Sequence, residues 1–196
     1  MVERARFGAG KARGGGSKRS GPLTRDELDA AALRYLDRFD SSAKNLERVL
    51  LGYVKRAADE RGADAAEGRA LVDELLSRYE SSGLLDDARF AGTLASGLRR
   101  RGASSRAIGH KLRARGVSEE VASQALAGVD ADAGKEAELD AARAFVRRRR
   151  IGGFRPAAER GACYRRDLGA LARAGFDMDV ARRALGSAGS DDDDTF

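Results

Sequence analysis

The chain has 196 residues, of which 42% are hydrophobic, enough to bury a core. Its 37 Lys and Arg exceed its 31 Asp and Glu, and the net charge of +6 favours a polyanionic partner such as nucleic acid. The single cysteine, Cys163, excludes an internal disulfide, and with the single histidine, His110, it cannot form a Cys/His zinc site. No stretch approaches the roughly 18 apolar residues of a membrane span, and we expect a cytoplasmic protein. We also expect that the protein holds no metal and no cofactor.

Both ends of the chain have the composition of disordered tails. Residues 1–22 place six Lys and Arg among many glycines, with too little apolar surface to offset the entropy of ordering. Residues 188–196 contain the acidic run Asp191–Asp194. We therefore predict a disordered basic arm at the beginning of the chain and an acidic tail at its end.

The region between the tails is predicted to be all-α, because proline is rare and apolar residues recur every three or four positions. Thr24 and Glu27 form a capping box for a first helix, and Ser42 can cap a second. A third helix follows, which gives a first three-helix repeat over 24–83. No glycine is expected to close the second helix, which continues into a charged insertion at 57–70.

The string GLLDDARFA at residues 83–91 opens the second repeat, predicted over 84–128. Its adjacent acids could suggest an active site. Asp86, however, stands where a helix needs an N-cap, and Asp87 adds negative charge to the first turn, where the helix dipole favours it. We therefore expect both acids to begin a helix.

An internal repeat links this region to the end of the chain. Residues 112–126 and 171–185 share a helix end, a glycine and a short final helix, which predicts a third repeat over 130–187. Three tandem three-helix repeats of this size should stack into an elongated, curved array. At a constant offset of 59, Leu112, Gly116, Val121, Ala122, Ala125 and Leu126 recur as Leu171, Gly175, Val180, Ala181, Ala184 and Leu185.

No catalytic motif is found. The sequence contains no GxxxxGK[ST], GxGxxG, GxSxG or HExxH pattern, so we do not expect an enzyme. His110 follows helix-forming residues beside Lys111 and is expected to be exposed. Cys163 lies on an apolar stripe and is expected to be a small buried thiol.

Basic clusters recur at equivalent places in the second and third repeats. Cations at helix C-termini are stabilising by about 0.3–1 kcal/mol each, but one or two would suffice. Runs of three and four arginines indicate a surface that meets phosphates or an acidic protein. The candidate binding residues are Arg99, Arg100, Arg101, Arg106, Lys111, Arg113, Arg115, Arg147, Arg148, Arg149, Arg150, Arg155, Arg165 and Arg166.

The string GLLDDARFA, the basic run after it and KLRARGVSEEVASQAL at 111–126 resemble the middle repeat of the RecX family, bacterial regulators of the RecA recombinase. The resemblance spans residues 30–186. It implies tandem three-helix repeats and a non-enzymatic, monomeric regulator of homologous recombination, DNA repair and the SOS response. Such a protein binds the RecA filament on single-stranded DNA, and duplex DNA more weakly, and reduces ATPase, strand-exchange and coprotease activities.

Two other classes of function remain open at this stage. A three-helix unit with an arginine-rich helix could be a helix-turn-helix transcriptional regulator that binds a defined duplex without any recombinase. The chain could also be a helical protein–protein adaptor whose charge serves only solubility. Whether a RecX-like chain inhibits or assists the recombinase in its own cell is likewise open.

Overall fold

The computed structural model describes residues 21–133 and 136–187, so the predicted tails lie, apart from Gly21 and Pro22, outside the described residues. The prediction of an all-α fold is confirmed, since these ranges contain helices and no strand. No helix in the described part of the chain is long and apolar enough to cross a membrane. The helices are α1 (Arg25–Leu36), α2 (Ala43–Arg61), α3 (Ala65–Ser81), α4 (Asp87–Arg100), α5 (Ser105–Ala114), α6 (Glu119–Ala133), α7 (Ala137–Arg149), the short 3₁₀ helix η1 (Gly152–Phe154), α8 (Ala157–Arg173) and α9 (Met178–Ser187).

Several helices begin at the predicted caps. The Thr24 hydroxyl accepts from the Glu27 backbone N–H at 3.3 Å, and the Glu27 carboxylate accepts from the Thr24 N–H, which completes the capping box. Asp86 accepts from the Arg89 N–H at 2.9 Å and caps α4. Because each cap satisfies a backbone donor that the helix leaves unpaired, these starting points could be read from local sequence alone.

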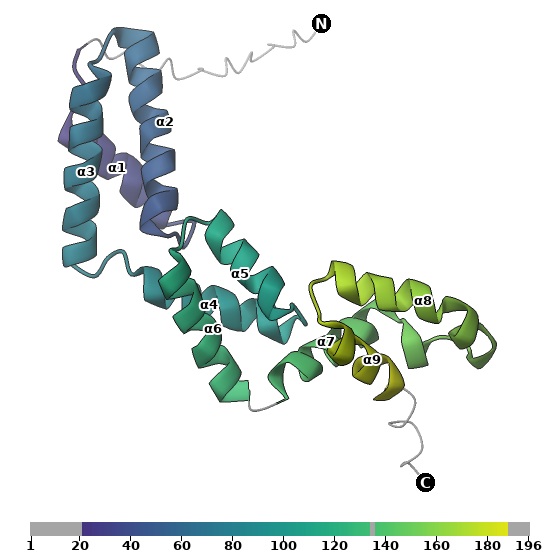
Figure 1. Cartoon of the computed structure of the whole chain (residues 1–196). Helices are drawn as coiled ribbons and strands as arrows, with labels where there is room; N and C mark the ends of the chain where they lie inside the picture. The colour runs from purple at the N-terminus through teal and green to yellow at the C-terminus, as the bar shows by residue number, and fades with distance from the viewer. Residues whose placement is uncertain (1–20, 134–135, 188–196) are drawn as a thin grey trace, which may run out of the picture.

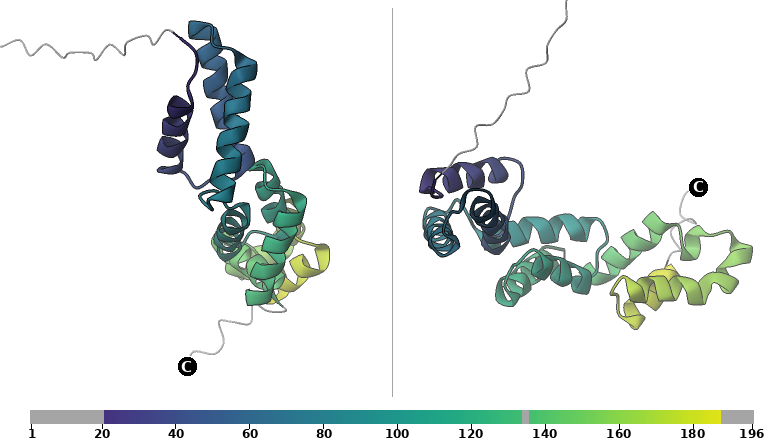
Figure 2. Two further views of the ribbon diagram at one scale, coloured as in Figure 1. Left: turned by 90° about the vertical axis from the view of Figure 1, so that its left-hand side faces the viewer. Right: turned by 90° about the horizontal axis from the view of Figure 1, so that it is seen from above.

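Buried apolar side chains form three clusters along the chain. Leu28, Leu46 and Val72 belong to the cluster of α1–α3, Ile108 to that of α4–α6, and Val146 to that of α7–α9. We call these groups of helices unit 1, unit 2 and unit 3. Figures 1 and 2 show the units following one another in an elongated, bent row, with unit 1 and unit 3 at opposite ends.

The end of α2 differs from the prediction that no glycine closes it. Gly62 lies at φ +70 and ends α2 in the left-handed conformation that favours glycine. The segment 57–70 contains the end of α2 and the start of α3. The equivalence with the other repeats is hidden in the sequence because α2 has 19 residues and α5 has 10.

Consecutive units are joined by the same kind of hydrogen bond, from a serine hydroxyl to a carbonyl at the end of a helix. The Ser42 hydroxyl donates to the carbonyl of Arg115 at the end of α5, and the Ser104 hydroxyl donates to that of Ala174 at the end of α8, at 2.6 Å. A glycine follows each carbonyl, at φ +82 and +92 respectively. The repeated glycine thus ends a helix, as predicted, and also lies against the preceding unit.

An acid from the next unit completes each junction. The Asp87 carboxylate accepts from the backbone N–H of Ala43, the first residue of α2, at 2.8 Å. The Glu138 carboxylate accepts in the same way from Ser105, the first residue of α5, at 3.1 Å. Asp87 therefore does more than stabilise its own helix, since it also satisfies the N-terminus of a helix in unit 1.

Candidate functional site

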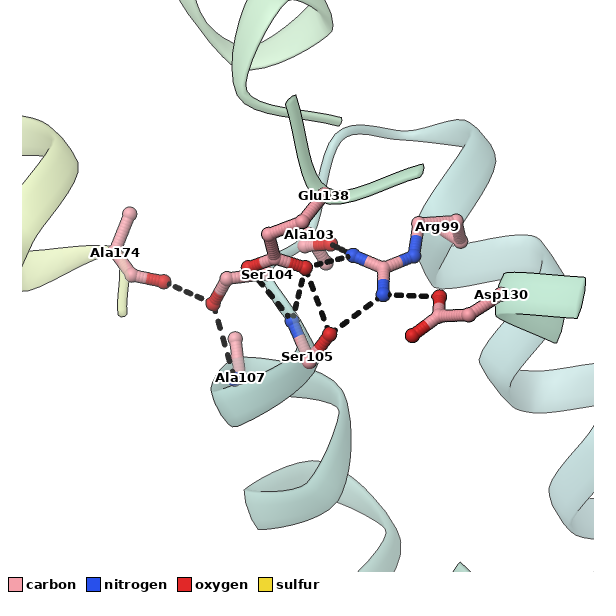
Figure 3. A network of polar contacts seen from close by, with 8 residues as sticks. All are labelled: Arg99, Ala103, Ser104, Ser105, Ala107, Asp130, Glu138 and Ala174. Carbon is pink, nitrogen blue, oxygen red and sulfur yellow. Dashed lines mark hydrogen bonds and ion pairs between the residues drawn. The ribbon is translucent and has the colours of Figure 1, made fainter. Parts of the chain in front are cut away.

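Arg99, a predicted binding residue, lies buried at the junction of units 2 and 3, where Figure 3 shows its contacts. Only 7% of the residue is exposed. Its guanidinium donates to Asp130 at 2.5 Å, to Glu138 at 2.6 Å, to the Ser105 hydroxyl at 2.6 Å and to the Ala103 carbonyl at 3.0 Å. The Arg99 side chain therefore joins α4, α5, α6 and α7 and presents no free guanidinium edge to a ligand.

Arg155 is also engaged within the protein. Its guanidinium donates twice to the Asp167 carboxylate, at 2.8 Å each, and Asp167 accepts a third bond from the Gly152 N–H at 3.0 Å. The hydrogen bonds from Arg155 lower the pKa of Asp167 from its ordinary value, and the Gly152 bond contributes in the same direction. Asp167 is thus a buried, ionised partner of Arg155, and no local sequence pattern predicted this role.

The other twelve predicted binding residues have exposed side chains. Some of them have structural contacts as well: the Arg148 guanidinium donates to the Arg101 carbonyl across the junction, and Arg113 pairs with Glu119 at 2.9 Å. Arg101 donates to the Gly97 carbonyl at 3.0 Å, and Arg166 donates to the Cys163 Sγ. The exposed set comprises Arg100, Arg101, Arg106, Lys111, Arg113, Arg115, Arg147, Arg148, Arg149, Arg150, Arg165 and Arg166.

Charge is distributed unevenly between the units. Residues 24–83 contain 13 Asp and Glu against 10 Lys and Arg, so unit 1 is net negative. Residues 84–128 contain four acids against eight Lys and Arg, and residues 130–187 contain nine against thirteen. A polyanion would therefore meet an attractive surface on units 2 and 3 and a repulsive one on unit 1.

Arg150 has an unusual backbone conformation. It ends α7 at φ +52 and is the one non-glycine residue with positive φ within the described ranges. An L-residue pays about 1–2 kcal/mol to adopt this left-handed conformation, which glycine adopts freely. The preceding arginines Arg148 and Arg149 lie over the Phe145 ring, at 5.9 and 5.6 Å from its centroid.

A hollow of about 520 Å³ lies between the C-terminal end of α7 and one face of α8. It brings together Arg149, Arg155 and Arg166, which were predicted as binding residues, and adds Arg173, which was not. Arg173 stands alone in a helix sequence, so no run of charge marked it. The lining residues are Phe145, Arg149, Ile151, Arg155, Arg166, Asp167, Ala170, Arg173 and Ala174.

The single histidine and the single cysteine lie in different helices, His110 in α5 and Cys163 in α8. His110 is exposed, as predicted. Cys163 is only half-buried, contrary to the expectation of a buried thiol, with its Sγ 3.1 Å from the guanidinium of Arg166. Within residues 21–133 and 136–187, no group of three or more His, Cys, Asp and Glu side chains is placed to hold a metal ion.

Comparison with known proteins connects these repeats to one family. The family model described as "RecX, second three-helix domain" matches residues 86–126, which begin at the N-cap of α4 and end within α6. No solved structure matches the chain significantly.

Curated relatives match over most of the chain. The regulatory protein RecX of Myxococcus xanthus is 37% identical over 187 residues, covering 95% of this chain and 98% of its own. That of Corynebacterium efficiens is 31% identical, covering 83% of each chain, and that of Halorhodospira halophila is 34% identical, covering 83% of this chain and 89% of its own. At this identity and coverage, the chain belongs to the RecX family of regulatory proteins.

Proposed function

We propose that this chain binds the RecA filament on single-stranded DNA and reduces the ATPase, strand-exchange and coprotease activities of the recombinase. The observation that carries the proposal is the set of exposed cations on units 2 and 3, in a chain of the RecX family. The regulatory proteins of this family are non-enzymatic. Regulation must therefore come from binding energy that differs between states of the filament.

The proposed interface consists of the exposed cations alone. Arg99 and Arg155 are left out of it, because their guanidinium groups are already paired with buried or half-buried carboxylates. Releasing Arg99 to meet a phosphate would leave Asp130 and Glu138 without their partner. In this proposal both arginines hold the binding surface in shape and do not contact the filament.

The elongated array supports a polymeric target. Contacts in two consecutive units can meet successive subunits or phosphates of a filament, so that several weak contacts add to a useful affinity. The bonds from Ser104 to the Ala174 carbonyl and from Arg99 to Glu138 connect units 2 and 3 and limit the relative movement of the two basic surfaces. Limited relative movement reduces the conformational entropy that binding must overcome.

A recombinase ATPase assay on single-stranded DNA tests the proposal. Substoichiometric amounts of the chain should lower ATP turnover, because one bound molecule affects more than one filament subunit. Unchanged turnover and filament length would contradict the proposal. Tight binding to one defined duplex without recombinase would instead support the helix-turn-helix alternative.

A further inference from the structure

The hollow between α7 and α8 combines an apolar floor with a cationic rim. Phe145 and Ile151, each 7% exposed, contribute to its floor. Arg149 from α7 and Arg166 and Arg173 from α8 supply exposed guanidinium groups around it. Such a combination suits a ligand with both an anionic and an apolar part.

The hollow keeps a strong positive charge although Asp167 also lines it. Asp167 is 2% exposed and accepts three hydrogen bonds, from Arg155 and Gly152, so its charge is offset by Arg155. None of Arg149, Arg166 and Arg173 forms an ion pair with a carboxylate in the part of the chain that the structure describes. Three guanidinium groups are thus available to an anion from outside.

Two of these cations, Arg166 and Arg173, lie along one face of α8. Arg166, Ala170 and Arg173 follow a four- and three-residue spacing, so they share one face of α8. Seven residues of helix separate the two arginines by about 10 Å along the axis. Arg106 of unit 2 lies beside Gly175, just after the end of α8, because its Cβ is 3.2 Å from a Cβ placed on that glycine.

We propose that this hollow is a binding site for the sugar–phosphate backbone of one nucleic-acid strand, with Arg166 and Arg173 as its main phosphate ligands. Arg166 and Arg173, about 10 Å apart along α8, can contact two phosphates of one strand, which a single compact anion does not offer. The apolar floor can receive the uncharged face of a base, which a duplex keeps stacked inside. The inference rests on the proposed function, because it assigns the DNA contact of the filament complex to unit 3.

Binding of the full-length chain to a fluorescein-labelled oligothymidylate, followed by anisotropy without recombinase, tests the site. The double variant Arg166→Gln/Arg173→Gln should bind about tenfold more weakly at low salt. The slope of log K against log salt concentration should become shallower by about 1.4, since each lost phosphate contact accounts for about 0.7 on a single strand. Arg166→Lys/Arg173→Lys should retain most of the binding, because it keeps the charges.

The matched control is Arg34→Gln/Arg69→Gln, which removes the same charge from exposed positions of unit 1. It should leave the dissociation constant within about twofold of the wild type. Equal weakening by both glutamine pairs would show a general charge effect and would overturn the proposal. Absence of oligothymidylate binding by the wild type, or equally effective competition by polyglutamate or inorganic phosphate, would also overturn it.

The assay separates this inference from the proposed function. If the wild type lowers recombinase ATPase but the Arg166→Gln/Arg173→Gln variant binds oligothymidylate normally, only the inference fails. If that variant loses oligothymidylate binding but the wild type leaves ATPase unchanged, only the proposed function fails. Circular dichroism should show equal helicity for all variants, since the four arginines are exposed on helix surfaces.

Discussion

The two junctions between units share one plan but differ in strength. Each has a serine hydroxyl that donates to a helix-end carbonyl, a glycine at positive φ and an acid that caps a helix of the preceding unit. Only the second junction adds a buried arginine with two carboxylate partners and a bond from Arg148 to the Arg101 carbonyl. The residues of the shared plan are Ser42, Gly116 and Asp87 at the first junction and Ser104, Gly175 and Glu138 at the second.

This difference coincides with the distribution of charge. Units 2 and 3 carry the excess of cations and are joined by the stronger junction, whereas the net-negative unit 1 is attached by the simpler one. The repeat thus supplies a common junction, and the additional ion pairs lie between the two units that carry the excess of cations. Substitutions at the junctions and at the helix ends beside them should therefore differ in their effects on stability.

The largest effect is expected from Arg99→Ala. Removing the guanidinium leaves Asp130 and Glu138 without their common partner, and we expect a loss of about 3 kcal/mol in the free energy of unfolding. Urea denaturation followed by circular dichroism measures it. Arg100→Ala, at the exposed neighbouring position, is the control and should change stability by less than about 0.5 kcal/mol. Equal midpoints for the two variants would contradict the structural role of Arg99.

The next largest losses of stability are expected for substitutions of the glycines at the two junctions. A Cβ at Gly175 would lie 2.6 Å from the Ser104 hydroxyl, and a Cβ at Gly116 would lie 2.6 Å from the Lys44 Cβ. With the cost of positive φ added, Gly175→Ala and Gly116→Ala should each lose about 2 kcal/mol of stability. Gly128→Ala in α6 is the control, where a Cβ meets open space and should stabilise by up to about 1 kcal/mol. A stabilised Gly175→Ala protein would refute the packing described here.

The serines should have smaller effects. Ser104→Ala removes the cap of α5 and the bond to the Ala174 carbonyl, and Ser42→Ala does the same for α2 and Arg115. We expect each to lower the free energy of unfolding by about 1–2 kcal/mol. Thermal or urea unfolding of both variants beside Ser81→Ala, an exposed position, measures the difference. If neither serine variant differs from Ser81→Ala, the shared plan of the junctions is wrong.

The smallest effect on stability concerns the ends of α4 and α7. Gly102, which follows α4, lies at φ +75, whereas Arg150 ends α7 at φ +52. Arg150→Gly should leave stability unchanged or raise it by up to about 1 kcal/mol, because the strain is relieved. The same variant should weaken the effect on the recombinase, since one exposed cation is lost. A clear fall in stability on urea denaturation would show that Arg150 is needed for the fold and not for binding.

Local signals in the sequence predicted much of this fold. Thr24, Ser42 and Asp86 cap helices where their spacing predicts, and Gly116 and Gly175 end α5 and α8 as the internal repeat indicated. Each of these helix ends depends on hydrogen bonds between residues that are close in the sequence, so a local sequence pattern can predict it. The end of α2 was missed because its glycine falls later than in the shorter α5.

Contacts between distant residues could not be predicted in the same way. Arg99 looks like the first of three equivalent arginines, and only the positions of Asp130 and Glu138, 31 and 39 residues away, distinguish it from Arg100 and Arg101. The second role of Asp87 likewise depends on Ala43 in another unit. The sequence therefore predicts the candidate site as a set of cations. It does not distinguish the cations that form contacts within the fold from those that are exposed.

The proposal that exposed cations of units 2 and 3 bind the filament can be tested with charge-reversed variants. It is tested most directly by replacing Arg147, Arg149 and Arg150 with glutamate and measuring recombinase ATPase on single-stranded DNA. Arg148 is kept, because it bonds to unit 2. A control with Arg34, Arg38 and Arg69 replaced by glutamate carries the same charge change on unit 1. We expect that the first variant no longer lowers ATPase while the control still does, and undiminished inhibition by the first variant would show that these cations do not bind the filament.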